Sequence, residues 1–270
     1  MNGIKLFDVS LRDGLQSLKK IYTLSEKKEL LHKIVNKYSP YSIEVGSIVS
    51  SKVLPQMHNS IDLFKHANKQ GIPNLYMLTP NLKSVNTGLK YGVKNFSLIT
   101  SVSDDFQKKN INKSLIETKD ELSKIYSLLD NNNVENIKLY ISCINQCPIS
   151  GRKDTQYIVD EINYYIENYD NLSEICLSDT CGTLGFYDFK NIINLILKRH
   201  DLSLLNKISL HMHKNVNNEE IINILNYARL VGINRFDVSC LENAGGCSVT
   251  MENSKLNNNL HYEDYKQFLK

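Results

Sequence analysis

Residues 4–16 read IKLFDVSLRDGLQ, an apolar run that leads directly into a cation, a carboxylate and an amide. The run at 4–11 is typical of a β-strand. Seven further runs of this kind follow at intervals of roughly 20 to 40 residues, at 41–48, 73–79, 95–102, 137–143, 174–180, 207–213 and 235–240. Their recurrence predicts eight strands.

Segments with helical spacing of apolar residues separate these runs, and we expect helices at 25–38, 112–129, 154–169, 188–200 and 218–231. Ser25 is the expected N-cap of the first helix. Alternation repeated this often predicts an α/β fold, a parallel sheet closed into a (β/α)₈ TIM barrel, because each right-handed crossover returns the chain beside its last strand. A doubly wound open sheet is the alternative, but no GxGxxG or GxxxxGK turn supports it.

The chain length fits one barrel. A (β/α)₈ barrel takes ~250 residues, and the chain has 270, so we expect residues 1–270 to form a single catalytic domain. Only residues 260–270 remain to supply an eighth helix. The barrel is therefore expected to have a shortened C-terminal end.

Charge and composition narrow the function. The formal net charge is +3, and no segment concentrates Lys and Arg into a stripe that could follow phosphates, so we expect no nucleic-acid partner. No segment approaches the ~20 apolar residues of a membrane span, and the start lacks a presequence. We expect a cytoplasmic protein without a membrane partner. The six cysteines match neither a CxxC zinc site nor a disulfide framework, and most are expected to be reduced and buried.

Polar groups gather at the strand ends, where a barrel carries its functional residues. Arg12, Asp13 and Gln16 follow the first strand, and the seventh reads ISLHMH at 208–213. A pleat period of two sends His211 and His213 to the same side. With Asp13 they offer two imidazole nitrogens and a carboxylate, which suit Mg²⁺, Mn²⁺, Fe²⁺ or Zn²⁺ and leave positions open for substrate. The alternative is a hydrogen-bonded histidine pair at the barrel mouth.

Three further residues have two interpretations each. Arg12 could be a surface cation or could neutralise a developing oxyanion. Asp179, at the end of the sixth strand, could stabilise a turn or belong to the site. Cys247 could be a packing residue, as most free cysteines are, or a general acid or base, since it follows the loop NAGG at 243–246, where a thiol has little core to pack into.

Several segments together resemble the hydroxymethylglutaryl-CoA lyases, a branch of the DRE-TIM metallolyases. They are RDGLQ at 12–16, IEVGS at 43–47, VLPQM at 53–57, LTPNLK at 78–83, KKNIN at 108–112, SCxxxCPxxG at 142–151, SDT at 178–180 and GGC at 245–247. The resemblance covers nearly the whole chain. The first motif and the HxH pair are shared with the Claisen-type synthases of the superfamily, whereas LTPNLK, KKNIN and SCxxxCPxxG resemble the lyase branch in particular.

The resemblance implies that a divalent metal, Mg²⁺ or Mn²⁺, is bound by Asp13, His211 and His213 together with Asn259. Asn259 is chosen because it begins NLHYED at 259–264, which is similar to the NLxxED segment of the family. Arg12 would then polarise the thioester carbonyl.

By the same resemblance Cys247 would shuttle a proton, and Asp179 would act as a base or orient the site. Glu44 and Gln16 would support Arg12 and the metal, and Thr180 would contact the substrate.

The implied reaction is a retro-Claisen cleavage of an acyl-CoA thioester, 3-hydroxy-3-methylglutaryl-CoA or a similar 3-hydroxyacyl-CoA, to acetyl-CoA and acetoacetate. Two alternatives stay open: a Claisen-type synthase joining an acyl-CoA to a 2-oxo acid, and a barrel that binds metal or acyl-CoA without turnover. A homodimer is an open option for the assembly.

The chain departs from the family pattern at three places. Lys214 to Asn217 stand where the family has an Asp and a Gly after the second His, and a lysine there would add positive charge near the metal. SVTM at 248–251 replaces a tyrosine-containing stretch. The C-terminal elements of longer relatives have no counterpart in residues 260–270.

Overall fold

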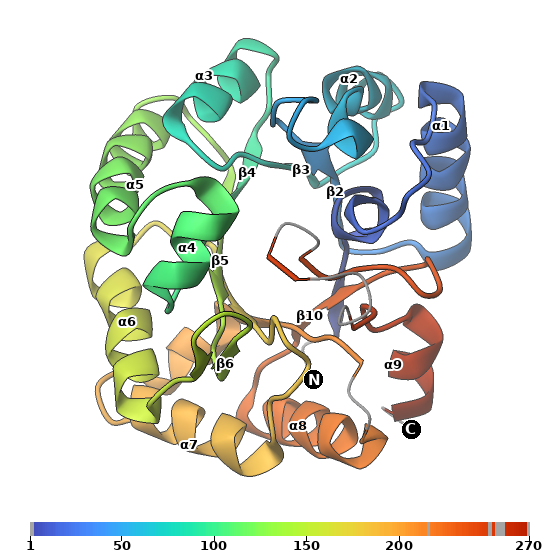
Figure 1. Cartoon of the computed structure of the whole chain (residues 1–270). Coiled ribbons are helices and arrows are strands. Elements are labelled where there is room, and N and C mark those ends of the chain that lie inside the picture. The colour runs from blue at the N-terminus through green and yellow to red at the C-terminus, as the bar shows by residue number, and fades with distance from the viewer. Residues whose placement is uncertain (1–2, 215–216, 248–249, 252–256, 269–270) are drawn as a thin grey trace.

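A computed structural model describes residues 3–214, 217–247, 250–251 and 257–268. Parallel strands of the described chain close into a ring in the order β1-β10-β9-β8-β5-β4-β3-β2 (Figure 1). They are β1 Lys5–Asp8, β2 Ser42–Ser47, β3 Leu75–Leu78, β4 Asn95–Ser101, β5 Asn136–Ser142, β8 Glu174–Ser178, β9 Ile208–His211 and β10 Arg235–Val238. Because β1 pairs with both β2 and β10, the sheet has no free edge. The predicted (β/α)₈ barrel is confirmed, and the open-sheet alternative is wrong.

Helices surround this barrel (Figure 1). Their bounds are α1 Leu24–Lys33, α2 Ser60–Lys69, α3 Leu82–Lys90, α4 Asp104–Ile111, α5 Leu115–Asp130, α6 Thr155–Asn168, α7 Phe186–Leu197, α8 Asn218–Val231 and α9 Tyr262–Phe268. Each long helix buries one apolar stripe, as α7 does with Phe189, Ile192, Ile193 and Ile196. Among the helices described here, none is both long and apolar enough to cross a membrane.

Several predicted helix boundaries are wrong because local capping sets them. Thr23, not Ser25, caps α1, since its hydroxyl accepts from the backbone N–H of Glu26 and the Glu26 carboxylate accepts in return. The helix expected at 112–129 is α5, which starts after its own N-cap, Ser114. Asn112 adopts a left-handed conformation and ends α4 instead. The helix predicted at 218–231 is confirmed as α8.

The first strand is shorter than predicted, and this places the site. β1 ends at Asp8, and Ser10–Gly14 form a π-helical turn, η1. The Asp8 carboxylate accepts hydrogen bonds from the backbone N–H and the hydroxyl of Ser10, a local interaction that competes with continuation of the strand. Arg12 and Asp13 therefore lie on this π-helical turn, at the mouth of the barrel.

The chain closes on itself through its last described helix, α9. The Tyr262 hydroxyl donates to Asp8 at 2.7 Å, and its ring stacks on Tyr38 with centroids 4.1 Å apart.

A two-stranded hairpin that the sequence did not predict follows β5 in the chain. It pairs β6 Gln146–Cys147 with β7 Gly151–Arg152.

Candidate metal centre and cavity

Asp13, His211 and His213 converge at the mouth of the barrel. Their ligand atoms all lie within 4.8 Å of one another, and all three residues are buried. Asp13 Oδ2 lies 3.8 Å from Nε2 of each histidine. This separation is too long for a hydrogen bond, but it is below the ~4.2 Å that can separate two ligands each ~2.1 Å from one ion. The fold thus brings together the three side chains that the strand period and the strand ends predicted to converge.

Both imidazoles are fixed through their other nitrogen. His211 Nδ1 lies 3.0 Å from Asp237 Oδ2, and His213 Nδ1 lies 2.9 Å from the backbone oxygen of Asp179. A carboxylate and a carbonyl only accept hydrogen bonds, so both Nδ1 atoms carry the proton. Each Nε2 therefore presents a lone pair toward Asp13, as a metal ligand must.

Buried polar atoms without partners mark the same point. Within the described part of the chain, His213 Nε2 and both amide atoms of Asn259 have no hydrogen-bond partner. Asn259 is 3% exposed and is bridged to His213 in antiparallel fashion. Buried polar groups without a protein partner are typical of a ligand site. Two imidazoles, a carboxylate and an amide oxygen suit a divalent cation.

Gly245 brings the last of these groups into place. Its φ of 118° is in the region that favours glycine, and a Cβ there would overlap the Asn259 side chain. Its N–H donates to the Ser17 hydroxyl at 2.8 Å, and the N–H of Gly246 donates to Asp13 Oδ2 at 3.2 Å. The loop after β10 is thus tied to the turn that carries Asp13.

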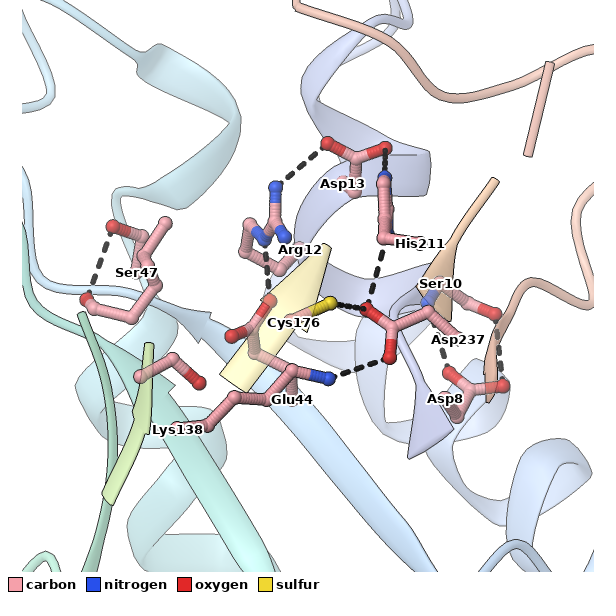
Figure 2. Close-up of polar contacts among 12 residues, drawn as sticks. Asp8, Ser10, Arg12, Asp13, Glu44, Ser47, Lys138, Cys176, His211 and Asp237 are labelled. Carbon is pink, nitrogen blue, oxygen red and sulfur yellow. Dashed lines mark hydrogen bonds and ion pairs between the residues drawn. The ribbon is translucent and has the colours of Figure 1, made fainter. Parts of the chain in front are cut away.

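Arg12 lies between two carboxylates, as Figure 2 shows. Its Nε donates to Glu44 and its Nη1 donates to Asp13 Oδ1 at 2.6 Å. Burial alone would raise the pKa of Asp13, but the guanidinium of Arg12 holds it well below its usual range. Asp13 is therefore an anion at neutral pH, although it is 4% exposed.

A cavity of about 650 Å³ opens above these groups. Its floor includes Arg12, Asp13, His211 and His213, and its walls include the predicted site residues Gln16, Thr180 and Cys247. Apolar side chains from the chain after β2, β3 and β4 form part of the remaining walls: Val49, Val53, Leu54, Pro80, Phe106 and Ile111.

Two of the predicted residues contact neighbours at the rim. Cys247 is half-buried, and its thiol lies 3.4 Å from the amide oxygen of Asn110, in α4. The Thr180 hydroxyl accepts from the backbone N–H of Cys143 at 2.9 Å. The KKNIN segment therefore contacts the loop cysteine, and the SCxxxCPxxG segment contacts the chain at the end of β8.

Asp179 occupies the position of a turn-stabilising carboxylate. Its two oxygens accept from the backbone N–H groups of Thr183 and Leu184 at 3.1 and 3.0 Å. Between the two interpretations left open by the sequence, this geometry favours the turn. Asp179 still contacts the site, because its backbone oxygen holds His213.

The side chain of Lys214, which follows the second histidine, forms an ion pair with a carboxylate of α9. Its ammonium pairs with Asp264 in α9 at 2.9 Å, and its backbone N–H donates to the oxygen of Asn258. The other departures fall partly outside the described residues: this applies to Asn215 and Val216, and to Ser248 and Val249. The positive charge of Lys214 is thus paired with the carboxylate of Asp264.

Two residues of the site were missed by sequence analysis. Asp237 in β10 and Lys138 in β5 are buried inside the barrel and pair with each other at 2.5 Å. Opposite charges in the middle of two apolar runs were the available signal, because a buried charge requires a partner. The pairing itself joins residues 99 positions apart, which no local pattern shows.

The sequence is similar to a known protein family and to lyases of that family. The family model described as HMGL-like matches residues 3–240. A 3-hydroxy-3-isohexenylglutaryl-CoA/hydroxy-methylglutaryl-CoA lyase of Pseudomonas aeruginosa is 29% identical, over 90% of this chain and 78% of its own. The mitochondrial hydroxymethylglutaryl-CoA lyase of Arabidopsis thaliana is also 29% identical over 90% of this chain, but the match spans only half of that protein.

Solved structures agree on the fold. The crystal structure of a hydroxymethylglutaryl-CoA lyase from Pseudomonas aeruginosa superposes with a TM-score of 0.82 at 27% identity, covering 99% of this chain and 85% of that one. An HMG-CoA lyase from Acinetobacter baumannii, in complex with coenzyme A and 3-methylmalate, gives the same TM-score at 22% identity, covering 97% of this chain and 81% of that one.

Proposed function

Since the chain belongs to the HMGL-like family, we propose that it is a divalent-metal-dependent carbon-carbon lyase. Its substrate is 3-hydroxy-3-methylglutaryl-CoA or a close 3-hydroxyacyl-CoA, and its products are acetyl-CoA and a 3-oxo acid, acetoacetate for the first substrate. The observation that carries this proposal is the convergence of Asp13, His211 and His213 at the cavity, where the buried Nε2 of His213 has no hydrogen-bond partner among the described residues.

Asp13, His211, His213 and Asn259 would hold the metal, Mg²⁺ or Mn²⁺. A cation held there would supply Lewis acidity, which would lower the pKa of the substrate hydroxyl. Asp179 acts as a positioning residue, because its backbone oxygen orients His213.

Arg12 stabilises the charge that develops during cleavage. When the bond between C2 and C3 breaks, its electron pair moves to the thioester side and forms an enolate, while the hydroxyl becomes a ketone. The guanidinium is held by Glu44 and Asp13, and its other N–H groups can bind the thioester oxygen. Such a preorganised donor acts more strongly on the transition state than on the substrate.

Cys247 moves the proton. The proton lost by the hydroxyl and the proton gained by the enolate carbon balance: the Cys247 thiolate can accept the first, and the thiol so formed can deliver it to the enolate carbon. Its place on the cavity wall supports this role. Gln16 and Thr180 line the same cavity and are proposed to contact the substrate.

Lys83 and Lys109 support a CoA thioester as the ligand. Both line the cavity, at the beginning of α3 and near the end of α4. Two ammonium groups suit the phosphates of CoA, and the apolar walls between them and Arg12 suit its thioester arm.

A coupled assay with Mg²⁺ or Mn²⁺ tests the proposal. We expect release of acetoacetate and acetyl-CoA from 3-hydroxy-3-methylglutaryl-CoA, lost when a chelator is added. Consumption of acetyl-CoA with a 2-oxo acid would instead indicate a Claisen-type synthase. Metal binding without turnover of either substrate would indicate a binding barrel.

A further inference from the structure

A buried charge network contacts His211 on the side of its ring opposite Asp13 (Figure 2). The two oxygens of Asp237 have different partners: Oδ1 accepts from Lys138 at 2.5 Å, and Oδ2 accepts from His211 Nδ1 at 3.0 Å. All three residues are at least 95% buried. Asp237 therefore connects an interior ammonium to a residue of the cavity floor.

Lys138 is held by more than one group. Its ammonium also pairs with Glu174 at 2.7 Å and lies 3.6 Å from the ring centroid of Phe7. Glu174 in turn pairs with Arg235 at 3.1 Å. Among the described residues, Glu174 forms no hydrogen bond or ion pair with His211. Lys138 thus has two carboxylate partners, of which one reaches the cavity floor and the other does not.

Such a network is costly as a stabilising device. Each buried ion loses several kcal/mol of hydration, and apolar side chains of similar volume often stabilise a core equally well. Both oxygens of Asp237 accept hydrogen bonds, one from the ammonium of Lys138 and one from the ring of His211, and this arrangement favours the carboxylate anion. The network therefore has a role besides packing.

We infer that Asp237, held by Lys138, is a positioning residue that fixes His211 as an Nε2 metal ligand. The inference rests on the metal site proposed above. An ammonium can only donate, so one Asp237 oxygen must face Lys138, and the charge of the second oxygen keeps the His211 proton on Nδ1. The lone pair is then on Nε2, beside Asp13.

Asp237→Asn should change the protonation of the His211 ring. The single amide oxygen must face Lys138, so the amide N–H₂ is directed at His211 Nδ1. That nitrogen must then accept, which moves the imidazole proton to Nε2 and removes the ligand lone pair. Glu174→Gln is the matched control, because it removes one carboxylate from the same ammonium, at similar burial, without contacting His211.

The test is calorimetric titration of the three proteins with Mn²⁺. We expect Asp237→Asn to weaken Mn²⁺ binding by about 10- to 100-fold and Glu174→Gln to change it by less than about 3-fold. Equal losses in both variants, or none in Asp237→Asn, would overturn the inference. A wild-type chain that binds no Mn²⁺ would overturn the proposed function instead.

A second measurement needs no stable variant. Nitrogen-15 NMR of metal-free wild-type protein labelled at histidine distinguishes the two neutral tautomers of the ring. His211 is expected to carry its proton on Nδ1. A signal from the Nε2-protonated form would contradict the inference even if Asp237→Asn failed to fold.

Discussion

Arg12 is confined by the carboxylates of Glu44 and Asp13 and by the ring of Tyr140, whose centroid lies 5.2 Å from its guanidinium carbon. Burial alone would lower the pKa of this arginine, but the two carboxylates raise it well above its usual value. The side chain is therefore a permanent cation whose position is set before any substrate arrives.

Arg12→Gln should lower kcat by roughly 10²- to 10³-fold, because it removes a positive charge that acts on the developing enolate. The Kd for Mn²⁺ should change far less, since Asp13 keeps its contact with the N–H of Gly246. Steady-state kinetics and calorimetry measure the two effects. Arg152→Gln, which removes an exposed arginine paired with Asp188, is the control. Parallel loss of turnover and metal binding would contradict a role on the transition state.

Sequence patterns predicted individual residues where a short period controls direction. His211 and His213 could be paired in this way because two residues along an extended chain return to the same side. Asn259 was proposed only from resemblance to a family, and its approach to His213 depends on the close contact with Gly245. Asp237 and Lys138 were missed because their pairing requires the closed barrel.

The elements β1, η1 and α9 are joined through one buried carboxylate. Asp8 accepts from Ser10 at the start of η1 and from Tyr262 in α9. Burial raises its pKa to about 6, although these hydrogen bonds oppose the shift. Folding therefore retains a proton on Asp8 that the unfolded chain releases near pH 4.

This linkage predicts a pH dependence. Between about pH 4 and 6 the folded state binds the Asp8 proton and the unfolded state does not, so the stability derived from it falls as pH rises. Asp8→Asn has no such proton. The free energy of unfolding of Asp8→Asn, relative to wild type, should thus rise by roughly 1–3 kcal/mol from pH 4 to pH 7. Urea titrations in metal-free buffer measure it, and a constant difference would contradict the assignment.

Element boundaries were harder to predict than the elements themselves. The alternation of strands and helices follows from apolar periodicity, which the sequence displays directly. The end of β1 depends instead on the hydrogen bonds that Ser10 donates to the Asp8 carboxylate. The start of α1 depends on the reciprocal hydrogen bonds between Thr23 and Glu26. Side-chain bonds of this kind move an element end by several residues without changing its pattern.

The whole barrel is needed to assemble the proposed metal site. Asp13 lies on the turn after β1, the histidines lie at and beyond the end of β9, and Asn259 follows β10. These segments meet only when the ring closes between β1 and β10. A metal that binds all of them therefore binds the folded state and not the unfolded chain.

Metal removal should accordingly lower the stability of the molecule. At a free Mn²⁺ concentration 100 times Kd, binding adds about 2.7 kcal/mol, which corresponds to a rise in Tm of several degrees for a chain of this size. Differential scanning calorimetry with Mn²⁺ and with a chelator measures the shift. His213→Ala should show little or none of it; an equal shift in this variant would contradict the ligand assignment.

The central claim is that one cation is bound by Asp13, His211, His213 and Asn259. Crystals grown with Mn²⁺ and measured at the manganese absorption edge test it directly. We predict an anomalous peak about 2.0–2.2 Å from Asp13 Oδ2 and from Nε2 of both histidines. Well-ordered density for these side chains with no peak between them, at a Mn²⁺ concentration that saturates any binding seen in solution, would contradict the claim.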